Sequence, residues 1–275
     1  MAEAYDRAEE ALYGKVRGLF GGRIDKAVSG AAPISAEILE FFYACGVPVL
    51  EGFGLTETTA CGVVNTLDAL KFGTVGRAMP GVELKIADDG EIMMKGPNVF
   101  REYWRNPEAT HDTFTDDGWF LTGDLGSLDD DGFLTITGRK KDIIITAGGK
   151  NLTPSNIEND LKQSRWVSQA VMYGDRRPYP VALITLDAEE MGPWARERGL
   201  PEDMASLVEA EEVQQLIQEV LDRANAKYAK VEQVKKFALL DHDLTQEAGE
   251  LTPTLKLKRN VVNEKYSDVF EDLYG

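Results

Sequence analysis

The sequence predicts a partial α/β layer, then a small β-rich, barrel-like module, and finally a mobile α+β domain at the C-terminus. A strand, a helix and a second strand follow one another within residues 24–50, which is typical of a parallel α/β layer. Short strands separated by turns fill residues 75–138. After Arg139, strand-like runs alternate with amphipathic helices, which indicates a second, α+β domain.

The length of 275 residues, of which 43% are hydrophobic and 28% charged, suits one large domain or two ordinary ones. We expect two. Residues 1–138 form the first, with the α/β layer at 1–74 and the β-rich module at 75–138, and residues 139–275 form the second. No long linker separates them, so we expect a short hinge at 139–141.

Acidic residues outnumber basic ones by 47 to 30, and the net charge of −17 opposes binding to nucleic acid. Two cysteines and two histidines provide neither a disulfide framework nor a zinc spacing. A charged stretch follows Met1, and no run reaches the ~18 apolar residues of a membrane-spanning helix. We therefore expect a cytoplasmic location without a transmembrane segment, and peripheral association with a membrane stays open.

Apolar residues at helical intervals predict a helix over residues 3–20, which ends at a Gly-Gly pair. Its Tyr5, Leu12 and Phe20 are core candidates.

The α/β layer is expected to continue with a strand at 24–28 and a turn at Gly30–Pro33. Ser35 is placed to cap a helix that runs to about Cys45, and an apolar strand follows at 47–50. This order implies two parallel strands joined by a helix.

The β-rich module begins with a hairpin. Strands at 82–86 and 91–95 flank an Asp-Asp-Gly turn. A second turn, Asp129–Gly132, precedes a strand at 133–137.

The C-terminal domain contains predicted strands at 181–186 and 237–240, and an apolar stripe of 3.6-residue period over 213–224 predicts a helix. The Ser-x-x-Glu pattern at Ser155 and Glu158 resembles a capping box, so we expect these residues to begin a helix rather than to act in catalysis.

The most informative segment, Glu51–Thr59, reads Glu-Gly-Phe-Gly-Leu-Thr-Glu-Thr-Thr and directly follows a predicted strand. Open α/β sheets bind ligands at such strand ends. Glycines let the backbone approach a ligand, an aromatic ring can lie on a base, a hydroxyl can bind a phosphate oxygen, and a carboxylate can hold Mg²⁺. Taken alone, the segment also suits a simple strand-to-loop transition.

This segment is similar to the Tyr/Phe-Gly-Leu-Thr-Glu signature of the adenylate-forming, AMP-binding superfamily, which includes acyl-CoA synthetases. The resemblance implies that Phe53 stacks on adenine, that Thr56 contacts the nucleotide phosphate, and that Glu57 ligates Mg²⁺. Thr56 and Glu57 thereby become candidate catalytic residues.

Small residues around this signature are expected to line the nucleotide. Gly52 and Gly54 let the backbone approach the nucleotide closely. Gly30, Ala31 and Ala32, followed by a proline, look like the strand that lines the adenine edge. A plain strand-to-helix turn is the alternative for this second stretch.

A second match, Gly118–Leu125, reads Gly-Trp-Phe-Leu-Thr-Gly-Asp-Leu and resembles the family's Trp-Phe-x-Thr-Gly-Asp segment. The resemblance implies that Asp124 binds the ribose, and the two oxygens of a carboxylate suit two vicinal hydroxyls. An aspartate after glycine is otherwise usually a turn former.

The third match, Gly138–Asn151, is similar to the family's hinge segment. By this resemblance Arg139 reaches the nucleotide ribose and phosphate through its fixed fork of donors, and Lys141 is the hinge. Gly148 and Gly149 suit a backbone that passes close to the pantetheine arm of CoA. A basic turn followed by an exposed hairpin is the alternative.

The fourth match, Leu251–Arg259, resembles the superfamily's C-terminal lysine motif in its long-chain form, with Lys256 as the catalytic lysine. An ammonium on a flexible stem can stabilise charge while a carboxylate attacks the α-phosphate of ATP. We expect Lys258 and Arg259 to be solvated or to face a partner.

Together the four matches imply a long-chain fatty acid–CoA ligase that uses ATP, Mg²⁺ and CoA. An acyl- or aryl-CoA ligase of another chain length is one alternative, and a non-catalytic module that contacts a nucleotide or CoA and binds a partner protein is another.

The family's phosphate loop, which ends in Pro-Lys-Gly, does not occur in the sequence. We therefore expect much of the ATP site and the acyl pocket to lie upstream, and catalysis by this chain alone is in doubt. The same reasoning predicts an unpaired sheet edge and dimerisation or aggregation.

Overall fold

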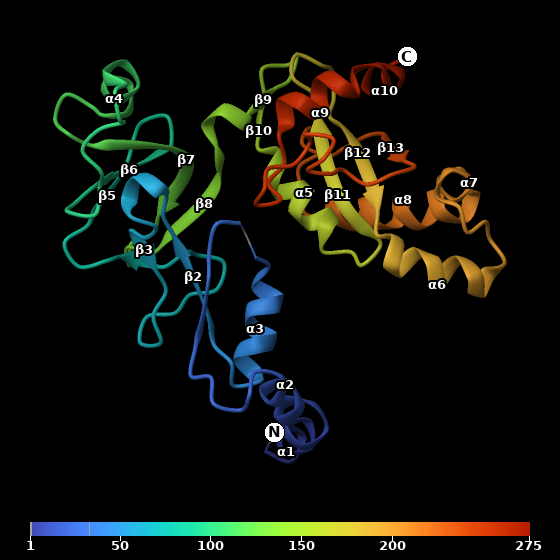
Figure 1. Ribbon diagram of the computed structural model, residues 1–275, viewed down its shortest axis with the longest axis horizontal. Coiled ribbons are helices and arrows are strands. Elements are labelled where there is room, and N and C mark those ends of the chain that lie inside the picture. The colour runs from blue at the N-terminus through green and yellow to red at the C-terminus, as the bar shows by residue number, and fades with distance from the viewer. Residues whose placement is uncertain (1, 33) are drawn as a thin grey trace. The chain divides into compact units, whose positions relative to one another are not determined.

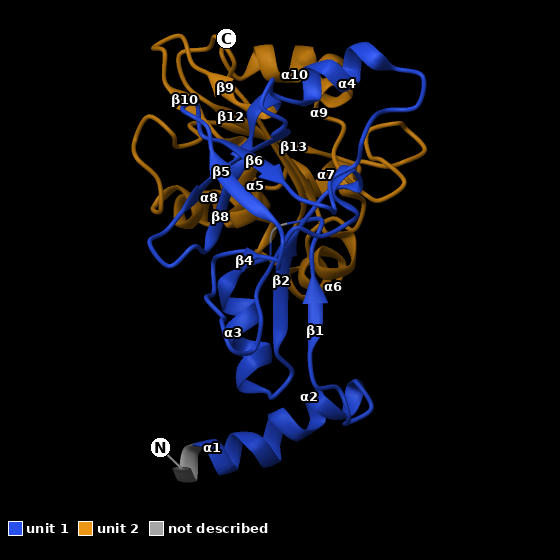
Figure 2. Cartoon of the chain, turned by 90° about the vertical axis from the view of Figure 1, so that its left-hand side faces the viewer, with its two compact units in different colours: residues 1–141 blue, residues 142–275 orange. Residues whose placement is uncertain are grey.

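The computed structural model describes residues 2–32 and 34–275. It divides into two compact units, residues 1–141 and 142–275, which Figure 2 colours separately. Both combine helices with sheets, which confirms the predicted fold class. Within the described part of the chain, no helix is both long and apolar enough to span a membrane.

Unit 1 begins with a continuous helical segment made of α1 (Ala2–Ala8), the π-helical turn η1 (Glu9–Tyr13) and α2 (Gly14–Leu19), as predicted (Figure 1). The expectation that Tyr5, Leu12 and Phe20 are core residues is wrong, because they are 52%, 45% and 47% exposed. Its packing contacts are mostly between its own turns, so few other residues of unit 1 cover these side chains.

The first sheet has the order β1-β2-β3-β4, with strands β1 (Ala27–Ser29), β2 (Val49–Phe53), β3 (Val63–Val64) and β4 (Arg77–Ala78). β1 and β2 are parallel and are connected through α3 (Ala36–Ala44), whereas the other pairs are antiparallel. The strand–helix–strand prediction is confirmed, although β1 begins three residues later than expected.

Helix α3 begins as the sequence predicts. The Ser35 hydroxyl accepts a hydrogen bond from the backbone N–H of Ile38 at 3.2 Å. On the inner side of the helix Leu39 is only 2% exposed.

The second sheet of unit 1 is antiparallel and contains β5 (Glu83–Ile86), β6 (Glu91–Lys95), β7 (Phe120–Leu128) and β8 (Leu134–Arg139). The short helix α4 (Pro107–Thr113) lies between β6 and β7 in the chain. Shifts in register along β6 and β7 are of the kind that make a sheet curl. Both predicted turns join neighbouring strands, so this part of the module is confirmed.

Unit 2 starts with the hairpin β9 (Ile144–Ile145) and β10 (Asn151–Leu152) and is centred on a mixed sheet. In that sheet β12 (Val181–Leu186) pairs antiparallel with β11 (Val167–Tyr173) and parallel with β13 (Phe237–Leu240). The remaining elements are α5 (Pro154–Lys162), α6 (Ala188–Arg198), α7 (Met204–Val208), α8 (Glu211–Asn225), α9 (Arg259–Lys265) and α10 (Ser267–Asp272).

Both faces of β12 are covered. Ala182 and Ile184 belong to one apolar cluster with residues of α5 and α8, whereas Val181 and Leu183 belong to another with α9 and α10. The stripe predicted for 213–224 is the buried face of α8. Unit 2 therefore contains complete cores on both sides of its sheet.

The predicted capping box at α5 is wrong. The helix begins after Thr153, whose side chain makes no capping bond, and Ser155 lies inside the first turn. Glu158 is 5% exposed and accepts two hydrogen bonds from Arg259 instead, because a long-range ion pair offers its buried carboxylate stronger partners than a helix end.

Candidate functional site

The carboxyl ends of β1 and β2 bring two of the matched segments together. Ser29 pairs with Glu51, so Gly30 lies beside Gly52. A Cβ atom on Gly30 would approach the Gly52 carbonyl oxygen to 3.2 Å, which shows how close the two backbones run. Ala31 has a φ of 69°, and both Ala31 and Ala32 are exposed. The proline of this motif, at position 33, lies outside the described residues.

The chain turns sharply after β2. A Cβ atom on Gly54 would lie 2.3 Å from the carbonyl oxygen of Ala60, so only glycine fits without a backbone shift. Phe53 is 7% exposed and packs in a cluster that includes Val63 and Phe120. Its stacking on adenine stays a prediction, because the ring is part of the core of unit 1.

Glu57 lies in the 3₁₀ turn η2 (Thr56–Thr58), whose Thr56 is exposed. Its carboxylate accepts a hydrogen bond from the Tyr103 hydroxyl at 2.7 Å. Burial, together with this contact, raises the pKa of the Tyr103 phenol, so Tyr103 remains the donor. Tyr103 has no motif of its own, and sequence reasoning missed it.

Phe100 connects this turn to the second sheet. Its backbone N–H donates to the Glu57 carbonyl at 2.7 Å, and its ring meets that of Phe120, on β7, edge-on at 5.8 Å. The signature turn is thereby fixed to the strand that carries Asp124.

Asp124 and Arg139 face each other on β7 and β8. The Arg139 Nε donates to the Asp124 carboxylate at 2.7 Å. The aspartate side chain is 7% exposed and that of the arginine 45%, so a buried carboxylate is held by a partly solvated guanidinium. The two residues predicted to contact the ribose therefore form one unit.

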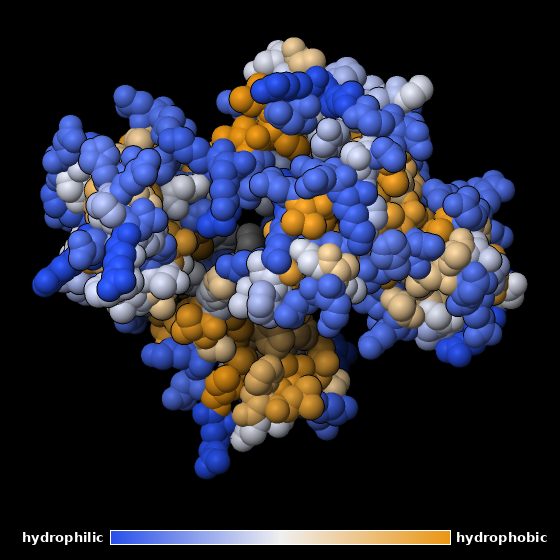
Figure 3. All heavy atoms as spheres, turned by 45° about the horizontal axis from the view of Figure 1, so that its top comes forward, coloured by the Kyte–Doolittle hydropathy of each residue, from blue (hydrophilic) through white to orange (hydrophobic). Residues whose placement is uncertain are grey.

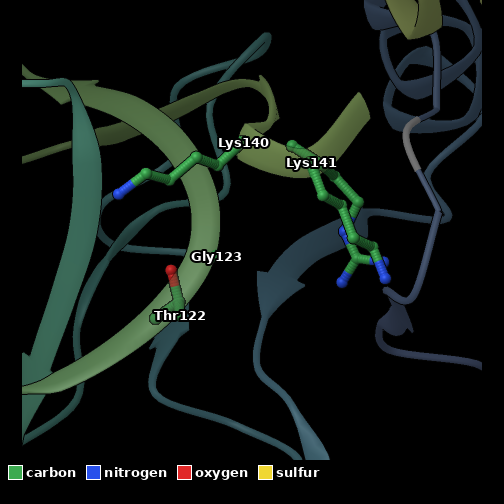
Figure 4. A pocket seen from close by; sticks show the side chains of 5 residues that line it. Thr122, Gly123, Lys140 and Lys141 are labelled. Carbon is green, nitrogen blue, oxygen red and sulfur yellow. The ribbon is translucent and has the colours of Figure 1, made fainter. Parts of the chain in front are cut away.

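A pocket of about 330 Å³ lies beside this pair, lined by Thr122, Gly123, Arg139, Lys140 and Lys141. Figure 4 shows the side chains of Lys140 and Lys141 pointing to opposite sides. The pocket lining includes three cationic side chains, of which Arg139 and Lys140 are already paired with carboxylates. The exposed Lys141 therefore contributes most to any attraction of an anionic ligand.

Lys140 is held by two carboxylates of the neighbouring hairpin. Its ammonium lies 2.6 Å from Asp89 and 2.8 Å from Glu91. Hydrogen bonds to these carboxylates raise the pKa of Lys140 to about 12. Lys141 is exposed and is the last residue of unit 1.

The buried acid Glu51 directly precedes the signature segment and is 9% exposed. Burial raises the pKa of its carboxyl to about 7, although a hydrogen bond from the Ile34 backbone opposes the shift. The sequence pattern assigns Glu51 no role, because its distinguishing feature is burial, which spacing does not reveal.

In unit 2, Gly148 and Gly149 form the tip between β9 and β10. A Cβ atom on Gly149 would meet nothing within 4 Å, and one on Gly148 would meet only the Thr146 hydroxyl at 3.9 Å. The tip is open, and its contact with CoA stays a prediction.

Lys256 is exposed on the loop between Leu251 and Leu257, which form an isolated antiparallel bridge. Lys258 is exposed, as expected. The expectation for Arg259 is wrong, because its side chain is 16% exposed and bonded to Glu158, a buried partner that outcompetes water through two parallel hydrogen bonds.

Among residues 2–32 and 34–275, no group of three or more His, Cys, Asp or Glu side chains is arranged to hold a metal ion. Glu57 is a single carboxylate that accepts a hydrogen bond from the Tyr103 hydroxyl. This suits Mg²⁺, which proteins often bind through one or two carboxylates together with substrate phosphates.

Comparison with protein families gives two matches. Residues 3–104 match the family "AMP-binding enzyme", and residues 141–275 match "AMP-binding enzyme C-terminal domain". The chain is 45% identical over 270 residues to the long-chain-fatty-acid–CoA ligase FadD15 of Mycobacterium bovis, covering 97% of this chain and 45% of FadD15. The chain thus spans about half the length of the curated relatives it matches.

Two solved structures illustrate the similarity. The adenylation domain of a carboxylate reductase from Mycobacterium chelonae is 27% identical, with a TM-score of 0.79 over 98% of this chain and 41% of that one. The O-succinylbenzoate coenzyme A synthetase of Bacillus subtilis, solved in complex with ATP and magnesium ion, is 29% identical, with a TM-score of 0.66 over 86% of this chain and 45% of that one.

Proposed function

Because the chain belongs to the family of AMP-binding enzymes, we propose that it supplies the ribose-binding pair and the catalytic lysine of an ATP-dependent long-chain fatty acid–CoA ligase. The fatty carboxylate attacks the α-phosphorus of ATP to form acyl-AMP, and pyrophosphate leaves. The sulfur of CoA then attacks the acyl carbonyl, and AMP leaves.

The observation that carries this proposal is the buried Asp124 carboxylate, oriented by Arg139 beside a pocket lined by cationic side chains. A carboxylate fixed in this way suits the two ribose hydroxyls of the nucleotide. Arg139, which is half exposed, would contact the ribose and phosphate, and the exposed Lys141 of the same pocket would add positive charge near the phosphates.

Glu57 would hold Mg²⁺, which neutralises charge on the phosphates when it is bound. Tyr103 orients the Glu57 carboxylate through its hydroxyl, and the neighbouring Thr56 is exposed to a ligand. ATP and Mg²⁺ are supported by the B. subtilis synthetase, whose structure contains both.

Lys256 would stabilise charge on the reacting groups during the first step. The open tip at Gly148 and Gly149 would pass the pantetheine arm of CoA in the second. We propose Lys141 as the hinge for a change of orientation between the two steps, because the boundary between the two compact units follows this residue in the chain. The long-chain substrate is supported by FadD15.

Pyrophosphate release with ATP, Mg²⁺ and palmitate tests the proposal. It is measured on this chain and on a version extended upstream to the length of its relatives. Palmitate-dependent release by the extended version is the expected result. Release by neither version would contradict the ligase assignment and favour a non-catalytic module, and release with octanoate but not palmitate would contradict the chain length.

A further inference from the structure

The loop that carries Lys256 is a tight turn in spite of its exposure. The backbone N–H of Thr252 donates to the Lys256 carbonyl at 2.8 Å, and the Lys256 N–H donates to the Thr252 hydroxyl at 3.0 Å. Leu255 has a φ of 59° and is 69% exposed. A residue other than glycine keeps this conformation only where its surroundings impose it. Because Leu255 itself is exposed, we expect contacts at the two ends of the loop to stabilise this conformation.

Glu250 holds the first end of the loop, and its side chain is only 1% exposed. One carboxylate oxygen accepts from the Tyr266 hydroxyl at 2.5 Å and from the Lys265 ammonium at 2.7 Å. The other accepts from the Thr245 backbone N–H at 2.7 Å. The backbone carbonyl of Glu250 accepts a hydrogen bond from the Lys258 N–H at 2.7 Å, so the two ends of the loop are joined to each other.

Arg259 holds the second end. Its guanidinium makes two hydrogen bonds to the buried Glu158 carboxylate, at 2.7 and 2.8 Å, and a third to the Met172 carbonyl at 3.1 Å. Glu158 also accepts from the Met172 N–H at 2.7 Å, so the pair is fixed to strand β11.

We propose that Glu250 and Glu158 are positioning residues for the adenylation step, and that they form a two-sided clamp that presents Lys256. This inference rests on the role proposed above for Lys256. Each carboxylate acts indirectly, by fixing one end of the loop: Glu250 is anchored through its own side chain, and Glu158 holds the Arg259 side chain. A lysine on an exposed loop is useful for charge stabilisation only if the ends of that loop are fixed, because misplacement by about 1 Å costs up to ~100-fold in rate.

The same unit contains a matched control. Asp160 accepts from the Tyr228 hydroxyl at 2.5 Å and from the Lys227 ammonium at 2.7 Å, which is the Tyr–carboxylate–Lys arrangement of the Glu250 cluster. These residues lie on α5 and just after α8, and no hydrogen bond among the described residues connects them to the Lys256 loop.

The test compares Glu250→Gln, Tyr266→Phe and Arg259→Lys with Asp160→Asn and Tyr228→Phe in the upstream-extended enzyme. Adenylation is followed as palmitate-dependent pyrophosphate release, and the second step as CoA attack on supplied palmitoyl-AMP. We expect the three clamp variants to slow adenylation about 10-fold or more and to leave the second step within about 2-fold. The two control variants should change neither step.

Amide hydrogen exchange over residues 251–258 in the same proteins measures the order of the loop independently of enzymatic activity. Faster exchange in Glu250→Gln than in Asp160→Asn is expected. Equal loss of both half-reactions in the clamp variants, or unchanged exchange in the loop, would overturn the proposal. If Lys256→Ala keeps full adenylation, the role of the lysine fails, and the exchange result still decides whether the clamp orders the loop.

Discussion

Single residues show where sequence reasoning works and where it fails. The sequence singled out Asp124 and Arg139 because each belongs to a short run of adjacent residues. The sheet register brings them face to face, and their contact with the ribose stays a prediction. The Tyr103–Glu57 contact joins residues 46 positions apart and the Arg259–Glu158 pair joins residues 101 apart. Such pairs depend on tertiary packing, and no local pattern encodes them.

Glu51 gives a prediction at this scale. Its carboxyl has a pKa of about 7 in the folded chain against 4.5 in the unfolded one, so folding favours its protonated form. Its contribution to stability is therefore present below pH 4.5 and is lost as the pH rises to about 7. Glu51→Gln should raise the thermal unfolding midpoint relative to the parent at pH 8 but not at pH 4.

The exposed Glu83→Gln, on β5, is the control and should show no such pH-dependent gain. A difference between Glu51→Gln and the parent that stays the same from pH 4 to pH 8 would show that the buried carboxyl does not titrate in this range.

At the scale of elements, the helices and strands predicted from hydrophobic spacing are present in the structure, because the period is a local property. Short elements such as α4, α7 and β3 were not predicted. Spacing did not reveal which faces are covered. The helical segment at the N-terminus has the expected period, yet Leu19 is 86% exposed and Phe20 47%. The predicted cap of α5 was also wrong, because Glu158 accepts hydrogen bonds from Arg259 instead of capping the helix.

The exposed apolar side chains of α1, α2, β1 and α3 predict self-association. Val28, on the edge strand β1, is 68% exposed, and Ile38 and Phe41 on α3 are 44% and 41% exposed. Figure 3 shows hydrophobic atoms gathered in this part of unit 1. Val28→Lys should lower the fraction of dimer and larger species in sedimentation velocity, because a charged edge strand resists pairing.

Val231→Lys provides the comparison, since Val231 is 56% exposed in unit 2 outside this apolar surface. Equal sedimentation of Val28→Lys and the parent at every concentration would exclude the β1 edge as the contact.

At the scale of the whole molecule, the sequence predicted the fold class, and the structure has two compact units that each possess their own core. The clusters on both faces of β12 consist entirely of residues from 142–275. Local patterns cannot give the order β11-β12-β13, because β13 is separated from β12 by three helices.

Residues 142–275 should therefore fold as an independent unit. Expressed alone, this segment is expected to unfold cooperatively in urea and to give dispersed amide NMR signals. A collapsed spectrum without a cooperative transition would show that its cores depend on unit 1.

The central claim is that this chain carries the lysine for adenylation, and one comparison tests it most directly. In the upstream-extended enzyme, Lys256→Ala and Lys258→Ala remove neighbouring exposed ammonium groups. We expect Lys256→Ala to lower palmitate-dependent pyrophosphate release at least ~100-fold, as the loss of a transition-state charge contact does, and to spare CoA attack on supplied palmitoyl-AMP. Lys258→Ala should leave both steps near parental rates; equal losses in the two variants, or in both steps of Lys256→Ala, would contradict the account.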